Sequence, residues 1–214
     1  MPFRGPIRAA HAILRLGFVA AVIVGATSSL RATSVIPPSF EELVAQSDYV
    51  VRAVVKSVAF EERARPGGSK MIFSKVELEV RQVITGTPPS PLVLEVLGGV
   101  LNGKEIAIEG APKFRVGDES ILFVQGNGRQ IYPLVRMMHG LYRLEKDAAS
   151  GREYVTRSNG EPLADVGRVA EPIEATGPAS TQRAQAITSA LSPDDFVAKI
   201  RAAASQAAQS HVRQ

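Results

Sequence analysis

The stretch "DYVVRAVVKSVAF", residues 48–60, decides the fold class of this 214-residue chain. It holds five valines among thirteen residues and neither glycine nor proline. β-branched residues favour strands, because they pack well on a pleated surface. The apolar run is almost continuous, which predicts a long strand covered on both faces over part of its length, as where a strand bends through a barrel.

Further strand patterns follow, separated by turns that contain glycine or proline. The second, "MIFSKVELEVRQVI" (71–84), alternates apolar and charged residues, so that one face is buried and one is wet. We expect the others at 92–99, 104–110, 120–124 and 130–136, with a final hairpin over 140–157. Six or seven short strands predict a mainly β fold, a small closed or nearly closed β-barrel, with a sandwich as the alternative.

Two helices are expected at the ends of this β region. Residues 39–47, "SFEELVAQS", predict a short helix, because Ser39 and Glu42 fit the S-x-x-E capping box. After Arg157 the chain is rich in proline and has little apolar periodicity, which predicts a flexible linker over 158–191. A last helix with its tail is expected over 192–214, where a serine caps the helix and a proline takes its first position.

The first 32 residues have the pattern of a secretory signal peptide. Three arginines precede an apolar run from Leu16 to Ala26, and no acidic residue occurs before Glu41. The run is shorter than the about 20 apolar residues that a membrane span needs, which leaves an uncleaved anchor as the alternative. We expect cleavage after Ala32, with Ala26 as a competing site. The expected organisation is a signal peptide (1–32), a barrel domain (33–157), a linker (158–191) and a C-terminal helix (192–214), in a periplasmic or secreted protein that does not span the membrane.

Removal of residues 1–32 changes the charge balance of the chain. The whole chain has 25 Lys and Arg against 21 Asp and Glu, and four of the basic residues lie in this segment, which leaves 21 against 21. Nucleic-acid binding needs a basic face that neutralises phosphates, so we exclude that class. The chain also has no cysteine. This excludes thiol catalysis and cysteine-ligated zinc, and it leaves core burial to hold an exported domain together.

No arrangement of residues indicates an enzyme. The motifs of serine hydrolases, zinc peptidases and nucleotide-binding folds are absent from the sequence. His139 follows two methionines, but neighbours on a strand face opposite sides and do not meet at one metal ion. The paired carboxylates are expected on solvated faces rather than in a cleft; they are Glu61-Glu62, Glu77-Glu79 and Asp118-Glu119.

The stretch "TSVIPPSFEELVAQSDYVVRAVVKSV", residues 33–58, resembles the start of a netrin-like module, and it is most similar to the tissue inhibitors of metalloproteinases. In that family a signal peptide is followed by Cys-x-Cys, proline, a short helical stretch and a strand that begins with aspartate. Here Thr33-Ser34-Val35 stands in the place of Cys-x-Cys, and Pro37-Pro38 in the place of the proline. Asp48 begins the strand, and the spacing needs no gap.

Two later stretches add to the resemblance. "VELEVRQVITG" (76–86) is similar to the family's second strand, which also ends in a glycine, here Gly86. "FRVGDESILFVQG" (114–126), with Gly117, resembles another of its strands. The resemblance covers roughly residues 33 to 135 and implies a five-stranded OB-type barrel, in which Ser39, Glu42, Asp48, Gly86 and Gly117 have structural roles. The chain departs from the family in lacking every cysteine, and so the disulfides that clamp the mature N-terminus there are missing.

The resemblance implies an exported, non-catalytic inhibitor or companion of a secreted zinc metalloprotease, with no cofactor or metal of its own. The α-amine and the carbonyl oxygen of Thr33 would chelate the partner's zinc in the position that water normally holds. With a pKa of about 7.7–8.0, an α-amine releases its proton to a metal at little cost near neutral pH. Ser34 would then enter the protease's first specificity pocket, with Val35, Pro37 and Pro38 beside it.

A cell-envelope module of structural role that binds polysaccharide or protein is the alternative. OB-type barrels bind many ligands, and the fold alone does not fix one. The aromatic residues that would stack on a sugar are few: Phe73, Tyr132, Tyr142 and Tyr154.

Overall fold

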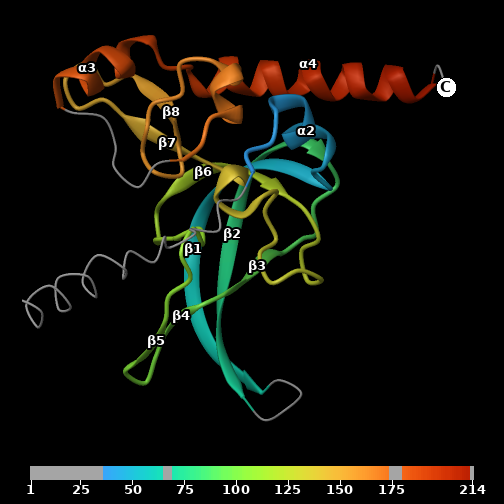
Figure 1. Cartoon of the computed structure of the whole chain (residues 1–214), viewed down its shortest axis with the longest axis vertical. Coiled ribbons are helices and arrows are strands. Elements are labelled where there is room, and N and C mark those ends of the chain that lie inside the picture. Colours follow the sequence, from blue (N-terminus) through green and yellow to red (C-terminus); the bar gives the residue numbers. More distant parts are fainter. Residues whose placement is uncertain (1–35, 65–68, 174–179, 213–214) are drawn as a thin grey trace, which may run out of the picture. The chain divides into compact units, whose positions relative to one another are not determined.

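The structure, a computed structural model, describes residues 36–64, 69–173 and 180–212; the expected signal peptide and Thr33, Ser34 and Val35 lie outside these residues. The fold is mainly β, and its main element is an antiparallel six-stranded sheet with the order β3-β2-β1-β6-β7-β8 (Figure 1). The strands of this sheet are β1 (Tyr49–Ala64), β2 (Lys70–Gly86), β3 (Leu92–Leu97), β6 (Glu119–Val124), β7 (Leu141–Lys146) and β8 (Glu153–Arg157). A separate two-stranded ribbon consists of β4 (Gly99–Leu101) and β5 (Lys104–Ile106). The helices are α2 (Phe40–Ala45), α3 (Ser180–Ser189) and α4 (Pro193–Val212), with 3₁₀ turns η1 (Met137–Gly140) and η2 (Val166–Ala170).

The sheet is open, so the predicted closure into a barrel is wrong. Strands β3 and β8 are its two edges, and no described strand joins them. Loop residues cover each edge instead: the N–H of Leu97 in β3 donates to the carbonyl of Ile131 (3.0 Å), and the N–H of Val155 in β8 donates to that of Leu191 (2.9 Å). These bonds satisfy backbone groups that a closing strand would have paired.

The order of the first four long strands is that of a Greek key. Strands β1, β2 and β3 are successive neighbours, and β6 returns through a long connection to lie beside β1.

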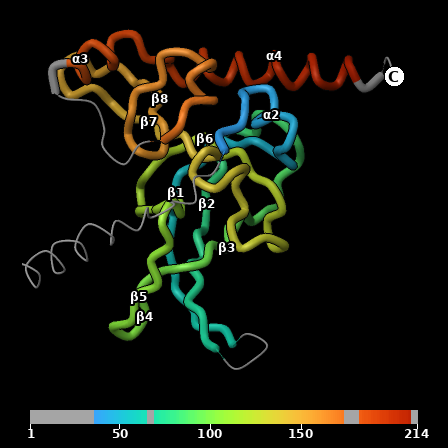
Figure 2. The backbone as a smooth tube through the Cα atoms, viewed as in Figure 1, coloured from blue at the N-terminus to red at the C-terminus, as the bar shows by residue number. Residues whose placement is uncertain are grey.

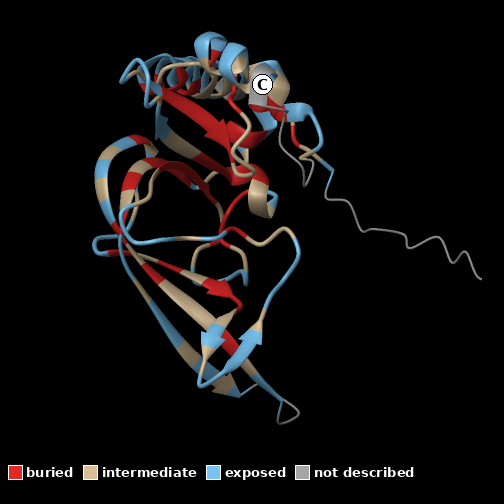
Figure 3. Cartoon of the chain, turned by 90° about the vertical axis from the view of Figure 1, so that its left-hand side faces the viewer, coloured by how far each residue is buried: buried red, intermediate tan, exposed pale blue. Residues whose placement is uncertain are grey.

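Strand β1 is buried on both faces over its first half, as its sequence predicts. Val50 and Val51 are both fully buried, yet they belong to different cores, because successive side chains point to opposite faces. The helix-side core joins the sheet to α2, η2 and α4 and includes Phe40, Val50, Phe123, Tyr142, Val169 and Phe196. The strand-side core includes Val51, Val55, Val76, Leu94, Leu122 and Leu141. Figure 3 shows this burial in the upper part of the sheet and growing exposure below it.

Strands β1 and β2 continue past the rest of the sheet as a long hairpin (Figure 2). β1 pairs with β6 only as far as Val54, whereas its pairing with β2 runs on to Ala64. We call residues 56–64 and 70–77 the arm. The strand predicted from residues 48–60 is therefore longer than expected, because Glu61 to Ala64 also belong to it.

The strand expected over 130–136 does not form. A single bridge joins Leu134 to Val124. Pro133 has no N–H to give to a ladder, and Arg136 and Met137 have left-handed backbones with φ of 49° and 56°. Alternating apolar residues alone were not enough to make a strand here.

Helices α2 and α4 pack together on the helix-side core. The predicted capping box is present: the N–H of Glu42 donates to the Ser39 hydroxyl (3.1 Å), and the N–H of Ser39 donates to the Glu42 carboxylate (2.9 Å). The rings of Phe40 in α2 and Phe196 in α4 lie 6.0 Å apart. Phe196 and Ile200, on the apolar stripe that the sequence shows, are fully buried. This helix therefore packs on its own domain.

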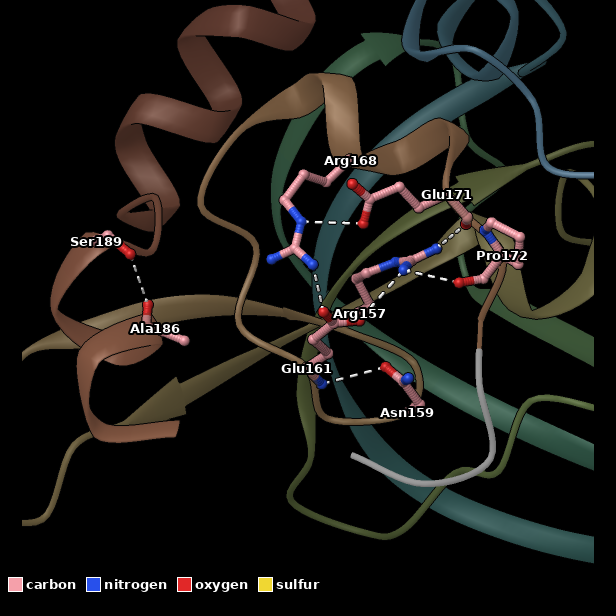
Figure 4. A network of polar contacts seen from close by, with 8 residues as sticks. All are labelled: Arg157, Asn159, Glu161, Arg168, Glu171, Pro172, Ala186 and Ser189. Carbon is pink, nitrogen blue, oxygen red and sulfur yellow. Dashed lines mark hydrogen bonds and ion pairs between the residues drawn. The ribbon is translucent and has the colours of Figure 1, made fainter. Parts of the chain in front are cut away.

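Contacts with Arg157 hold part of the segment 158–191 that was expected to be a flexible linker (Figure 4). The guanidinium of Arg157, only 2% exposed, donates to the Glu161 carboxylate (3.3 Å), to the carbonyl of Pro172 (3.2 Å) and to that of Glu171. Arg168 also donates a hydrogen bond to the Glu161 carboxylate, at 2.5 Å. Two apolar side chains of the segment are fully buried in the helix-side core, Leu163 and Val169. Charge-assisted bonds of this kind do not appear as a periodic apolar pattern in the sequence.

Within the three described ranges, no helix has the length and apolar character needed to cross a membrane.

Candidate functional site

The arm has an apolar face and a charged face. Val58 lies opposite Val76, and Phe60 lies opposite Ser74, on the apolar face. The charged face carries Glu61, which is one residue away from Phe60 and so points to the other side. The apolar face needs a cover, because apolar surface exposed to water is unfavourable.

A flap, residues 99–114 with β4 and β5, covers this apolar face. Its root is fixed by the N–H of Gly98, which donates to the carbonyl of Ile72 (2.8 Å), and by the Ser74 hydroxyl, which donates to the carbonyl of Gly98 (2.6 Å). Gly99 has a φ of 137°, and a Cβ there would lie 2.7 Å from Cε1 of Phe60 and 2.9 Å from the Ser74 hydroxyl oxygen. Only glycine allows this approach, and so the Gly98-Gly99 pair sends the chain across the arm.

A cavity of about 310 Å³ lies between the arm and the flap, and we call it the arm–flap cavity. It continues the strand-side core, since Val76 belongs to both. Its volume lies at the lower end of the range of about 300–1,000 Å³ found for ligand sites. The wall is mainly apolar and includes Val58, Phe60, Val76, Val96, Val100, Ile106, Ile108 and Phe114.

Few polar groups face this cavity. Glu105 and Lys113 are the ionisable residues that line it, and both are exposed. The Ser74 hydroxyl is already bonded to Gly98. None of the described buried side-chain atoms that lack a hydrogen-bond partner belongs to the wall. The cavity therefore suits an apolar occupant, because a buried polar one would lose its bonds to water without replacement.

The charged face of the arm is a closed network of ion pairs. The guanidinium of Arg63 donates two bonds to the Glu95 carboxylate (2.9 and 2.7 Å) and lies 5.0 Å from the centroid of the Phe73 ring. Lys75 bonds Glu61 at 2.8 Å. The bond from Lys75 lowers the pKa of Glu61, and the bond from Arg63 lowers that of Glu95. These carboxylates keep their charge and are already neutralised by neighbours.

The other paired carboxylates of the sequence are ion-paired too. Lys70 bonds Glu62 at 2.7 Å and Lys56 bonds Glu77 at 2.9 Å, and each bond lowers the pKa of its carboxyl group. A glycosidase-type site needs one carboxyl with a raised pKa, and these bonds act in the opposite direction. The remaining pairs are Arg81 with Glu79, Arg143 with Asp118 and Arg52 with Glu119.

A wide polar groove of about 820 Å³ lies next to the cavity and shares Ala111, Pro112 and Lys113 with it. Arg143 spans this groove: one nitrogen donates to Asp118 (2.6 Å) and another to the backbone carbonyl of Lys113 (2.5 Å). The backbone between the two spaces is thereby held in place.

The predicted N-terminal contact residues do not form a described site. Thr33, Ser34 and Val35 lie outside the described residues. Pro38 is buried and Pro37 is half-buried, whereas Ile36 is 78% exposed. The chain is therefore anchored from Pro38 onward, directly before α2.

The predicted structural residues have clear local environments. Asp48 lies directly before β1, and its carboxylate accepts a bond from the N–H of Gly126 (2.7 Å). Gly86 has a φ of 72°, and a Cβ there would lie 2.7 Å from Cα of Tyr49. Gly117 has a φ of 91° and donates its N–H to the carbonyl of Val55 (2.9 Å).

His139 is a buried residue of η1. It is 3% exposed, and Nδ1 has no hydrogen-bond partner. Burial is the main cause that lowers the pKa of His139, and with the added effect of the Arg157 and Arg136 charges this pKa is about 4. No group of three or more metal-binding side chains occurs among the described residues.

The aromatic residues considered for sugar stacking are not free platforms. Tyr142 and Tyr154 are buried, at 2% and 4% exposure. The ring of Phe73 lies under Arg63, and Tyr132 is half-buried.

Sequence reasoning missed the arm–flap cavity. Its walls come from four separate segments, and each of them reads as an ordinary strand or turn. The Gly98-Gly99 pair was the available signal, because two glycines after a strand mark a close backbone approach.

No protein-family model matches this chain, and no curated protein matches it either.

Proposed function

We propose that this protein is an exported, non-catalytic binding module of the netrin-like, OB-type class, and that the arm–flap cavity holds an apolar part of its partner. The cavity itself carries the proposal. It has an apolar wall, continues a core and has charged residues only where it meets solvent. Burial of apolar surface there would favour binding by about 25 cal/mol per Å².

The strand order supports the class. OB folds are partly open Greek-key barrels that bind ligands on the face of their second and third strands and on the loop between the first two. The cavity lies on this face: Val76 comes from β2 and Val96 from β3, and the arm consists of the end of β1 and the start of β2.

A protein partner fits better than a polysaccharide. Sugars bind through exposed aromatic faces and many hydrogen bonds, whereas Tyr142 and Tyr154 are buried and the cavity wall is apolar. A side chain or short segment of a protein supplies the apolar group that this wall requires.

For the partner we propose a secreted zinc metalloprotease, contacted through the mature N-terminus. The anchored Pro38 and the exposed Ile36 support this, because residues before a fixed root can be presented to another protein. The free amine of Thr33 would bind the zinc.

The cavity is tested by titrating benzene into protein with labelled valine and isoleucine methyl groups, followed by NMR. Benzene is the probe because apolar cavities bind it. We expect shifts at Val58, Val76 and Val96, and their loss in Val100→Trp. The matched control is Val83→Trp, since Val83 and Val100 are 45% and 51% exposed and only Val100 lines the cavity. Shifts that persist in Val100→Trp would exclude the cavity as the site.

The N-terminal contact is tested by inhibition of a panel of zinc metalloproteases. Protein that begins at Thr33 should inhibit, and the same protein with one extra residue before Thr33 should not. Equal inhibition by both would refute zinc chelation by the amine.

A further inference from the structure

We propose that the arm–flap cavity binds an aliphatic chain that ends in a carboxylate, and that Lys113 pairs with this carboxylate. The inference rests on the proposed function, because it takes the cavity as the binding site. It goes beyond that function by naming a small ligand that occupies the same cavity when no protein partner is bound.

The wall favours an aliphatic chain over a polar body. Val58, Val76, Val96 and Ile106 present branched aliphatic groups from both the arm and the flap. The Ser74 hydroxyl donates its proton to Gly98, so that it is not available as a donor to a ligand. A polar ligand would therefore be desolvated without new bonds.

The size of the cavity fits a chain rather than a single small ring. Its volume is about 310 Å³. Apolar cavities of about 150 Å³ bind benzene, so this space holds an apolar group about twice as large. A medium-length alkyl chain has this volume and can bend to follow the space between arm and flap.

Lys113 supplies a cation for one end of the aliphatic ligand, where the cavity meets the polar groove. Lys113 is exposed and lines both the apolar cavity and the polar groove, so this lysine stands at the boundary between an apolar space and a polar one. No carboxylate of the described residues lies within ion-pair distance of it. Its backbone is fixed by the bond from Arg143 (2.5 Å). A carboxylate there would pair with Lys113 and keep its contact with water.

Glu105, the other charged residue of the cavity, sets the direction of the aliphatic ligand. Glu105 is paired with Val100 across the ribbon and would repel an anion. The carboxylate end therefore lies at Lys113, and the alkyl end lies toward Val58 and Val76, where the wall joins the strand-side core.

The experiment compares decanoate with 1-decanol, which has the same chain without the charge, by isothermal titration calorimetry on the full chain below the micellar range. Decanoate should bind the unsubstituted protein, and Val100→Trp should weaken binding more than about tenfold, while Val83→Trp leaves it unchanged. Lys113→Met should weaken decanoate binding by about two- to fivefold, the effect of an exposed ion pair, and leave 1-decanol binding unchanged. Lys199→Met, an exposed lysine of α4 that lines neither space, is the matched control.

Three results would overturn the inference. Protein that binds benzene in the cavity but not decanoate would exclude the ligand class and leave the proposed binding site standing. Equal binding of decanoate by Lys113→Met would exclude the carboxylate contact. Unchanged binding of decanoate by Val100→Trp would show that decanoate binds outside the cavity.

Discussion

Acid should destabilise this protein through His139. The side chain is 3% exposed, and burial, with Arg157 and Arg136 nearby, lowers its pKa to about 4. In the unfolded chain a histidine has a pKa of about 6.5. The unfolded state therefore binds the proton more tightly between these two values. The contribution of the neutral, buried His139 to stability is therefore complete above about pH 6.5 and is lost as the pH falls toward 4.

The size of the effect follows from the two pKa values. A difference of about 2.5 pKa units corresponds to about 3.4 kcal/mol once the pH is well below the folded value. At pH 5 the loss is already about 2 kcal/mol. This is a substantial part of the 5–15 kcal/mol that holds an ordinary domain folded. Carboxyl groups with a lowered pKa, such as that of Glu61, lose their contribution only below their ordinary value of 4.5, so the window above pH 5 belongs to the histidine.

Urea unfolding at pH 7 and pH 5 measures the loss, and His139→Gln should remove it. His211→Gln is the control, because it also deletes a histidine. The histidine ring protons provide a second readout by NMR, and those of His139 should not titrate above pH 5 in the folded protein. A His139 titration near pH 6.5, or an equal loss of stability in His139→Gln, would refute this account.

Five further substitutions, one of them a control, test the packing by urea or thermal unfolding. Gly86→Ala should destabilise by about 2 kcal/mol or more, because its positive φ and a close backbone approach both resist a side chain. Gly117→Ala, with positive φ but open space around it, should cost less and serves as its control. Phe196→Ala should cost about 3–5 kcal/mol, since its ring is fully buried among three other rings. Arg157→Met should cost about 3–5 kcal/mol and loosen residues 158–173, which hydrogen exchange would detect. Ser39→Ala should lower the free energy of unfolding by about 1 kcal/mol, because it removes the cap of α2. Loss of the helix's protection from hydrogen exchange without that decrease would contradict the prediction.

The sequence predicted those elements whose signals are local. The capping box at Ser39 and Glu42 and the start of α4 at Pro193 depend on residues within one turn of each other. The double burial of β1 was visible because Val50 and Val51 are adjacent in the chain. These features need no knowledge of what lies across the sheet.

Closure of the sheet was not predictable in the same way. Whether β3 meets another strand depends on the loop that carries Ile131, which lies more than thirty residues further on. That loop bonds β3 without forming a strand, partly because Pro133 interrupts its pairing. A pattern of alternating residues shows which side is buried and leaves open what covers it.

The arm–flap cavity follows from a mismatch of lengths. Strands β1 and β2 have 16 and 17 residues, whereas β4 and β5 have three each. At about 3.3 Å per residue the ribbon spans about 10 Å, far less than the arm that it crosses. The charged face of the arm is stabilised by its own ion pairs, such as Arg63 with Glu95, and needs no cover. The apolar face does need one, and a ribbon of this length covers it only in part. The space left between Val58 and Phe114 is therefore a cavity that the protein itself does not fill and that a ligand can occupy.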